Sequence, residues 1–169
     1  MENREYHTED KSTWGEGPWM NEPDKMQFTD SATGLPCLIV RNHGGALCGY
    51  VGVPEGHPAY RKHYDHDVLQ SINVHGGLTF SDHCAKGESE ERHVCHVPAP
   101  GESDNVWWLG FDCAHLGDVS PAMDARLRTL GHREKLPGRM FGDGPAPRYR
   151  TVKYVKRHIA KLALQLNDM

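Results

Sequence analysis

Three residues that could bind a metal ion or transfer protons stand close together in the second half of the chain. Asp112, His115 and Asp118 lie within seven residues, with Gly117 among them. A carboxylate can orient an imidazole as a general base, and mixed nitrogen and oxygen donors suit Zn, Mn or Fe. We therefore predict catalytic roles for Asp112 and His115, and one divalent metal bound by His115, Asp112 and Asp118. The alternative is structural: Asp118 caps a turn and His115 bonds to the backbone.

A second candidate is the His-Gly-Gly sequence of residues 75–77. Because glycine lacks a Cβ, a ligand can approach the backbone N–H groups there closely, which suits an anion or a carbonyl oxygen. We predict a catalytic role for His75 and ligand-binding roles for Gly76, Gly77 and Thr79. The alternative is a strand bulge with a structural histidine.

Two further groups are weaker candidates. The loop from Val53 to Tyr60 could act as a lid, with His57 and Tyr60 as ligand contacts, or it could be a rigid surface turn. Four residues of the Cys and His types could hold zinc, although they lack the Cys-x-x-Cys spacing of common structural sites: Cys84, His93, Cys95 and His96.

Composition narrows the class of protein. The 169 residues carry a formal net charge of −4, which argues against a general nucleic-acid binder. No apolar run approaches the ~18 residues of a membrane span, and the first residues lack the apolar region of a signal peptide. Five cysteines, an odd number, then favour reduced thiols over a disulfide framework. We expect a cytoplasmic protein.

Periodicity predicts the elements that must position these residues. Apolar runs at 37–40 and 47–53 flank Gly-Gly, which is typical of a hairpin, and their continuous apolarity indicates that both faces are covered. We expect further strands over 71–80, 93–97 and the Trp107-Trp108 run, and a short helix near 123–130. An apolar stripe with helical spacing predicts a C-terminal helix capped by Thr151, formed by Val152, Val155, Ile159, Leu162 and Leu166.

Together these elements predict an α+β fold. We expect a mainly antiparallel, twisted sheet of about four to six strands, with the C-terminal helix on one face and many loops. Residues 1–33 are polar and rich in Gly and Pro around Trp14 and Trp19, so we predict an N-terminal arm that docks through these tryptophans. Residues 34–169 are predicted to form a single domain.

Five stretches also carry a resemblance that covers most of the chain: 34–40, 48–58, 74–80, 107–118 and 149–155. In their order along the chain and in their residues they resemble an uncharacterised family of small proteins encoded by bacteriophages and prophages. The resemblance implies the cytoplasm of a bacterial host during infection or lysogeny. It implies no activity.

Three functions follow as hypotheses. The first is a hydrolase, metal-assisted or not, for a small phosphorylated or nucleotide-like substrate, with His75, Asp112, His115 and Asp118 in one pocket. The second is a non-catalytic phage effector that inhibits a host defence protein. The third is a module that sequesters a small ligand. The first requires that His75 and the 112–118 cluster lie within hydrogen-bond or shared-ligand reach.

Overall fold

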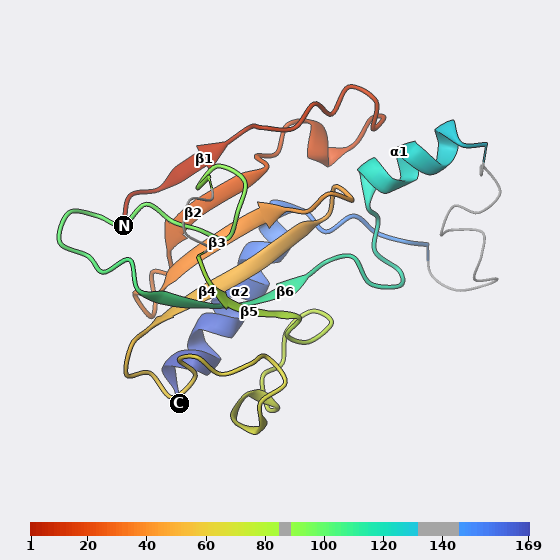
Figure 1. The fold of residues 1–169 in the computed structure, drawn as a ribbon. Helices are drawn as coiled ribbons and strands as arrows, with labels where there is room; N and C mark the ends of the chain where they lie inside the picture. The colour runs from red at the N-terminus through yellow and green to blue at the C-terminus, as the bar shows by residue number, and fades with distance from the viewer. Residues whose placement is uncertain (85–88, 132–145) are drawn as a thin grey trace.

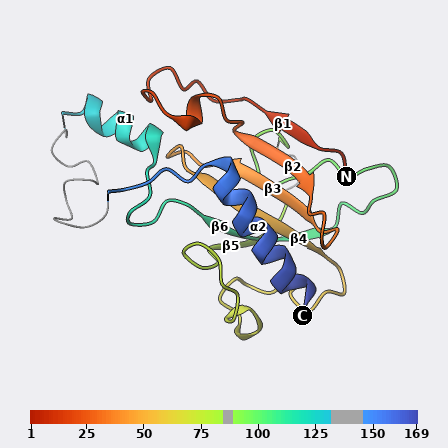
Figure 2. The same ribbon diagram turned by 180° about the vertical axis from the view of Figure 1, so that it is seen from behind.

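The computed structural model describes residues 1–84, 89–131 and 146–169 and confirms the predicted α+β fold. A six-stranded antiparallel sheet has the order β1-β2-β3-β4-β6-β5, and the C-terminal helix lies across one of its faces (Figures 1 and 2). The strands are β1 (Arg4–Tyr6), β2 (Lys25–Thr29), β3 (Pro36–Arg41), β4 (Leu47–Pro54), β5 (Phe80–His83) and β6 (Val106–Asp112). The helices are α1 (Pro121–Thr129) and α2 (Val152–Asn167), with short 3-10 turns at Pro18–Met20 and Asp67–Leu69.

The predicted hairpin is formed by β3 and β4, which pair from Arg41 opposite Leu47 outward. Its turn is closed by Asn42, whose side-chain oxygen accepts hydrogen bonds from the N–H groups of Gly44 and Ala46 at 2.9 and 3.1 Å. Gly45 has a φ of +88°, in the left-handed region that favours glycine. The turn therefore depends on glycine at position 45, one of the two glycines from which the hairpin was predicted.

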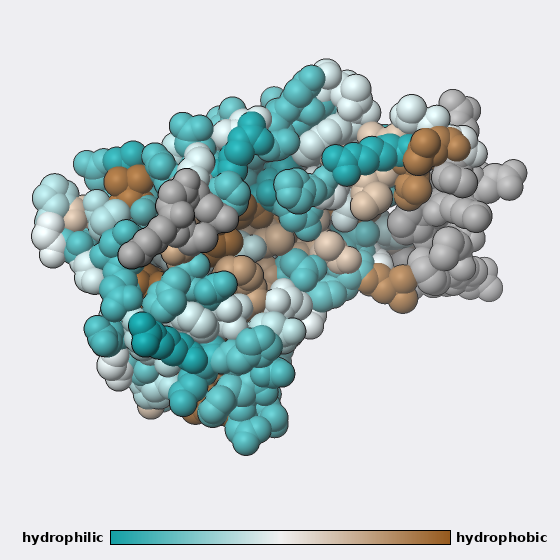
Figure 3. Space-filling view, viewed as in Figure 1, coloured by the Kyte–Doolittle hydropathy of each residue, from teal (hydrophilic) through white to brown (hydrophobic). Residues whose placement is uncertain are grey.

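Both faces of the central strands are covered, as their continuous apolarity predicted. Cys37 and Ile39 belong to the core beneath α2, whereas Leu38 and Val40 belong to a second cluster on the opposite face with Trp108. This alternation follows from the two-residue repeat of a strand. Figure 3, which views the face away from α2, shows apolar side chains in a hollow between polar ones.

Helix α2 forms as its sequence predicted. The Thr151 side chain accepts a hydrogen bond from the N–H of Tyr154 at 3.4 Å and caps the first turn. Ile159, Leu162 and Leu166 are fully buried against the sheet, where each such side chain stabilises the fold by about 1.5–3 kcal/mol. No helix among the described residues has the length and apolarity needed to span a bilayer.

Residues 1–33, expected as an arm, contribute β1 and β2 to the sheet. A buried charge cluster joins this segment to β3: Asp24 accepts from Arg41 Nε at 2.7 Å and pairs with Lys11 Nζ at 2.7 Å. Trp14 is buried, and Trp19 packs beside it. Trp14 clusters with Ala122 and Ala125 of α1, and the segment that carries both tryptophans supplies two strands of the sheet.

Two expected strands are absent from the described structure. Residues 72–79 are irregular apart from a turn at His75 and Gly76, because Gly76 and Gly77 take φ values of +66° and +85°, which a strand does not allow; β5 begins only at Phe80. Residues 93–97 are irregular. They are held instead by the side chains of the neighbouring sheet, since Gln27 bonds to both the N–H and the C=O of Val97.

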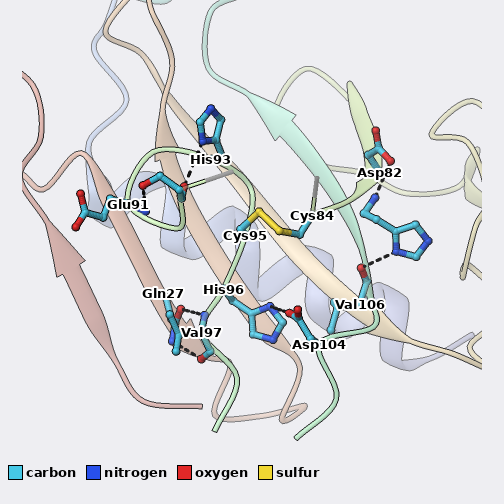
Figure 4. Close-up of a disulfide and its surroundings, with 12 residues drawn as sticks. Gln27, Asp82, Cys84, Glu91, His93, Cys95, His96, Val97, Asp104 and Val106 are labelled. Carbon is cyan, nitrogen blue, oxygen red and sulfur yellow. Dashed lines mark hydrogen bonds and ion pairs between the residues drawn. A yellow bond between two sulfur atoms is a disulfide. The ribbon is translucent and has the colours of Figure 1, made fainter. Parts of the chain in front are cut away.

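A disulfide between Cys84 and Cys95 ties this segment to the end of β5 (Figure 4). The expectation of reduced thiols is therefore wrong for these two residues, and their sulfurs cannot serve as zinc ligands while bonded to each other. Because disulfides are typical of oxidising compartments, the cytoplasmic location stays a prediction. The other cysteines are buried and free, namely Cys37, Cys48 and Cys113.

Candidate functional site

The His-Gly-Gly turn meets the acidic cluster that follows β6. His75 Nε2 lies 2.7 Å from Asp118 Oδ2, so the spatial convergence expected of these segments is present. The turn is held on α2 by two further side chains. Gln165 accepts from the N–H of Asn73 at 2.7 Å, and His158 Nδ1 accepts from the N–H of His75 at 3.1 Å. The position of the imidazole is thus set by the helix face beneath it.

Asp118 is placed by a short parallel bridge with Arg148. Gly117, with a φ of +91°, turns the chain after β6, and its C=O accepts from the N–H of Arg148 at 2.9 Å. This bridge brings Arg150 to the carboxylate, where its Nε donates to Asp118 Oδ1 at 2.7 Å. The N–H of His115 donates to Asp118 Oδ2 at 3.1 Å. Both carboxylate oxygens are therefore occupied, and the side chain is only 1% exposed.

The second nitrogen of His75 completes a chain of hydrogen bonds. Its Nδ1 lies 2.9 Å from the hydroxyl oxygen of Tyr154 on α2. Because an ionised carboxylate only accepts hydrogen bonds, Nε2 of a neutral His75 must carry the proton and donate to Asp118. Nδ1 is then left to accept from the Tyr154 O–H. The order is carboxylate, imidazole, phenol.

Positive charge surrounds the phenol. The guanidinium carbon of Arg150 lies 4.8 Å from the centre of the Tyr154 ring, and that of Arg157 lies 5.6 Å from it. The His158 ring lies 4.6 Å from the same ring. A negative charge on the phenol oxygen, or an anionic ligand beside it, would be stabilised by the two guanidinium groups.

Protonation states follow from the same contacts. Burial alone would raise the pKa of Asp118, but hydrogen bonds from Arg150 and His75 outweigh it and hold that pKa below its usual value. The bond to Asp118 in turn raises the pKa of Arg150. Burial, together with the positive charge of its neighbours, lowers the pKa of His158, which favours a neutral ring at pH 7. Asp118 is thus ionised and His158 neutral.

The His115 ring packs against the His-Gly-Gly turn. A Cβ at Gly76 would stand 1.8 Å from His115 Nε2, so only glycine leaves room for this ring. That nitrogen is buried and makes no hydrogen bond to the described residues, and Asp112 Oδ1 lies 3.7 Å from it. Asp112 itself accepts from the N–H of Ala114 at 2.9 Å, which is a turn-capping contact.

The residues predicted to bind a metal do not fit that role in this arrangement. Asp118 directs both oxygens at Arg150, His75 and the backbone, which leaves His115 and Asp112 as two donors. Among residues 1–84, 89–131 and 146–169, no group of three or more His, Cys, Asp or Glu side chains could hold a metal ion. Zn, Mn or Fe stays a sequence-based prediction that these contacts do not support.

The predicted lid residues lie elsewhere and have structural contacts. His57 Nε2 is 2.9 Å from the C=O of Leu166 at the end of α2, and the Tyr60 hydroxyl donates to Asn105 at 2.7 Å. Thr79 uses its N–H to bond Gly110 in β6 at 2.9 Å. No contact of the described structure brings His57, Tyr60 or Thr79 to His75.

Sequence reasoning missed three of the residues around His75: Arg150, Tyr154 and His158. They are spaced four residues apart, which places them on one side of a helix and its entry. The helix was interpreted from its apolar stripe alone, and the neighbouring polar face was not considered as part of a site. A Tyr and a His at that spacing were the available signal.

Comparison with known proteins does not identify the site. No family model, no curated protein and no solved structure matches this chain. The functional argument therefore rests on the geometry around His75, and the resemblance to phage proteins stays a prediction.

Proposed function

We propose that the protein is a hydrolase of a small phosphorylated or nucleotide-like substrate, which uses Asp118, His75 and Tyr154 as a proton relay. One observation carries the proposal. A buried carboxylate, an imidazole and a phenol are joined in sequence by contacts of 2.7 and 2.9 Å. A base oriented by a carboxylate is the arrangement that general-base catalysis requires.

The relay would work through the phenol oxygen. A water molecule bound there would give a proton to Tyr154 while the phenol proton passes to His75 Nδ1. Asp118 would stabilise the imidazolium that results, as the carboxylate does in a Ser-His-Asp triad. The hydroxide would attack phosphorus, and the leaving oxygen would take the proton back along the same path. Arg157, which is exposed beside Tyr154, is placed to attract the substrate anion.

The proposal needs no metal, and the test includes metals as a variable. Purified protein is assayed for release of nitrophenol from p-nitrophenyl phosphate and bis(p-nitrophenyl) phosphate, and of phosphate from nucleotides. Each assay is run with chelator and with added Zn, Mn or Fe, because the metal-assisted form of the hypothesis came from the sequence. If turnover requires an added metal, the metal-free relay is wrong and the metal-assisted form of the hypothesis takes its place.

The deciding variant is Tyr154→Phe, which removes one hydroxyl and keeps the ring. We expect it to lower the turnover number by about 10²- to 10⁴-fold. Tyr60→Phe is the matched control, because its hydroxyl bonds Asn105 away from His75, and its activity should equal that of the parent. Equal activity of both variants would contradict the relay. A second pair of results would also contradict the relay: the parent protein turns over none of these substrates, and Tyr154→Phe only loses stability. The hydrogen-bond network would then be structural.

The non-catalytic alternatives stay predictions. A host protein as partner and a phage origin rest on the resemblance alone, and none of the contacts around His75 favours them.

A further inference from the structure

A cavity of about 470 Å³ lies on another part of the molecule, beside the start of β3 and the end of β4. Its volume is within the range of small-molecule sites. Apolar side chains line part of it, including Leu35, Pro36 and Val106. None of the proposed relay residues takes part in this lining, so the cavity is independent of the proposed function.

A buried histidine in the wall of this cavity has an unused polar atom. The His96 side chain is 3% exposed, and its Nδ1 makes no hydrogen bond to the described residues. Asp104 Oδ1 is 3.8 Å away, which is beyond hydrogen-bond distance (Figure 4). A buried polar atom without a partner is costly, and a donor placed to one side of the two atoms can reach both.

The histidine is held rigidly. Its ring lies 5.4 Å from that of buried Trp108 in an edge-to-face arrangement, and the residue before it, Cys95, is fixed by the disulfide. Burial lowers the pKa of His96 in spite of nearby Asp104 and Glu102, so the ring is neutral at pH 7 and one of its nitrogens can accept a hydrogen bond.

The carboxylates of the lining outnumber its cations. Glu55 and Glu102 take part in it, whereas the Met1 amine is the one ammonium and no Lys or Arg side chain takes part among the described residues. The amine of Met1 donates to Glu102 Oε1 at 2.9 Å, which shows that an ammonium group can be accommodated at this rim. Exposed Asp104 adds a further carboxylate beside His96.

We infer that this cavity binds a small organic cation, a primary ammonium on a compact apolar body. The ammonium would sit at the His96 end of the cavity, where Nδ1 accepts one of its hydrogen bonds and Asp104, which is beside His96 but outside the lining, supplies a counter-charge. The apolar body would cover Leu35, Pro36 and Val106. A carboxylate or phosphate ligand would meet the Glu55 and Glu102 carboxylates and would bind more weakly.

Three probes of the same shape test the charge. Phenethylamine carries the ammonium, 2-phenylethanol has a neutral hydroxyl, and 3-phenylpropionate has a carboxylate. Titrations are followed by calorimetry and by protein NMR. We expect phenethylamine to bind one to one with a dissociation constant of about 1 mM or tighter, to shift the resonances of Leu35 and Val106, and to bind at least about tenfold more tightly than the other two.

Two variants test the residues. Asp104→Asn should weaken phenethylamine binding by about five- to tenfold. Glu16→Gln is the matched control, because this exposed carboxylate lies at another cavity, with Trp14 and Trp19, and should change nothing. His96→Phe keeps a ring against Trp108 but removes Nδ1, and should abolish binding while near-UV circular dichroism stays native; if it fails to fold, Asp104→Asn decides alone.

Several outcomes would overturn the inference. They are no saturable binding of phenethylamine up to about 10 mM, equal affinity for the amine and the alcohol, resonance shifts confined to other parts of the protein, or an Asp104→Asn affinity equal to that of Glu16→Gln. None of them bears on the relay at His75, so the two proposals fail separately.

Discussion

Replacing Asp118 by Asn tests whether the carboxylate holds three parts of the chain together. The parent carboxylate accepts from His75 Nε2, from Arg150 Nε and from the N–H of His115, at 2.7, 2.7 and 3.1 Å. Asparagine has nearly the same shape but only one oxygen. Its NH₂ group is a donor and would face the N–H donor of either Arg150 or His75, so one of these hydrogen bonds would be lost. The Arg150 guanidinium would also lose its counter-charge.

The size of the effect follows from burial. Removing one partner of a buried ion pair costs about 3–5 kcal/mol. The Arg150 side chain is 24% exposed, so it can turn partly to water, which places the expected loss near the lower limit, about 3 kcal/mol. The matched control is Asp112→Asn. That carboxylate is 29% exposed and accepts a backbone N–H that an amide oxygen can also accept, so we expect a change within about 0.5 kcal/mol.

The assay is urea unfolding followed by tryptophan fluorescence, because Trp108 is fully buried. The pKa of Asp118 is lower in the folded than in the unfolded protein. Its stabilisation is therefore complete above the unfolded value of about 4 and is lost as pH falls through the folded value. The difference between parent and Asp118→Asn should shrink in that acid range. A loss below about 1 kcal/mol at pH 7, or a difference that does not shrink in acid, would refute the reasoning.

Three other predictions follow from single contacts. Gly76→Ala should destabilise the fold by at least about 1 kcal/mol more than Gly77→Ala in urea unfolding. Both glycines take positive φ, but only a Cβ at Gly76 would clash with the His115 ring. Equal losses of stability would contradict that packing. The lowered pKa of His158 means that stability falls as pH drops below the unfolded value of about 6.5; NMR titration should give a midpoint below 6.5, and a higher one would be inconsistent with burial. Replacing Cys84 and Cys95 together by Ser should lower the free energy of unfolding by about 2–3 kcal/mol for a loop of this length, and thiol titration of the denatured parent should find three free thiols; five would disprove the disulfide.

Much of the fold could be predicted because its signals are local. The spacing of Ile159, Leu162 and Leu166 predicts α2, and Thr151 marks its start. The hairpin of β3 and β4 was recognisable from the two glycines between apolar runs. The expectation for 71–80 was wrong for a local reason as well, because Gly76 and Gly77 adopt left-handed conformations that end strand structure.

The candidate site was only partly predictable. His75 and Asp118 were identified by residue type, but twelve histidines share that type. His57 was equally eligible, yet it bonds a backbone carbonyl. Tyr154 contacts His75 across 79 residues of chain, and no periodicity within either segment indicates that the two will meet.

By itself the sequence determined the β3–β4 hairpin and α2, the two-sided burial of the central strands and the acidic turn after β6, since each depends on neighbouring residues and a fixed repeat. Tertiary structure alone decided that Cys84 bonds Cys95, that Arg150 takes one oxygen of Asp118, and that His75 lies between a carboxylate and a phenol. These contacts depend on how the helix and the turns pack against one sheet, and that packing is a property of the whole chain.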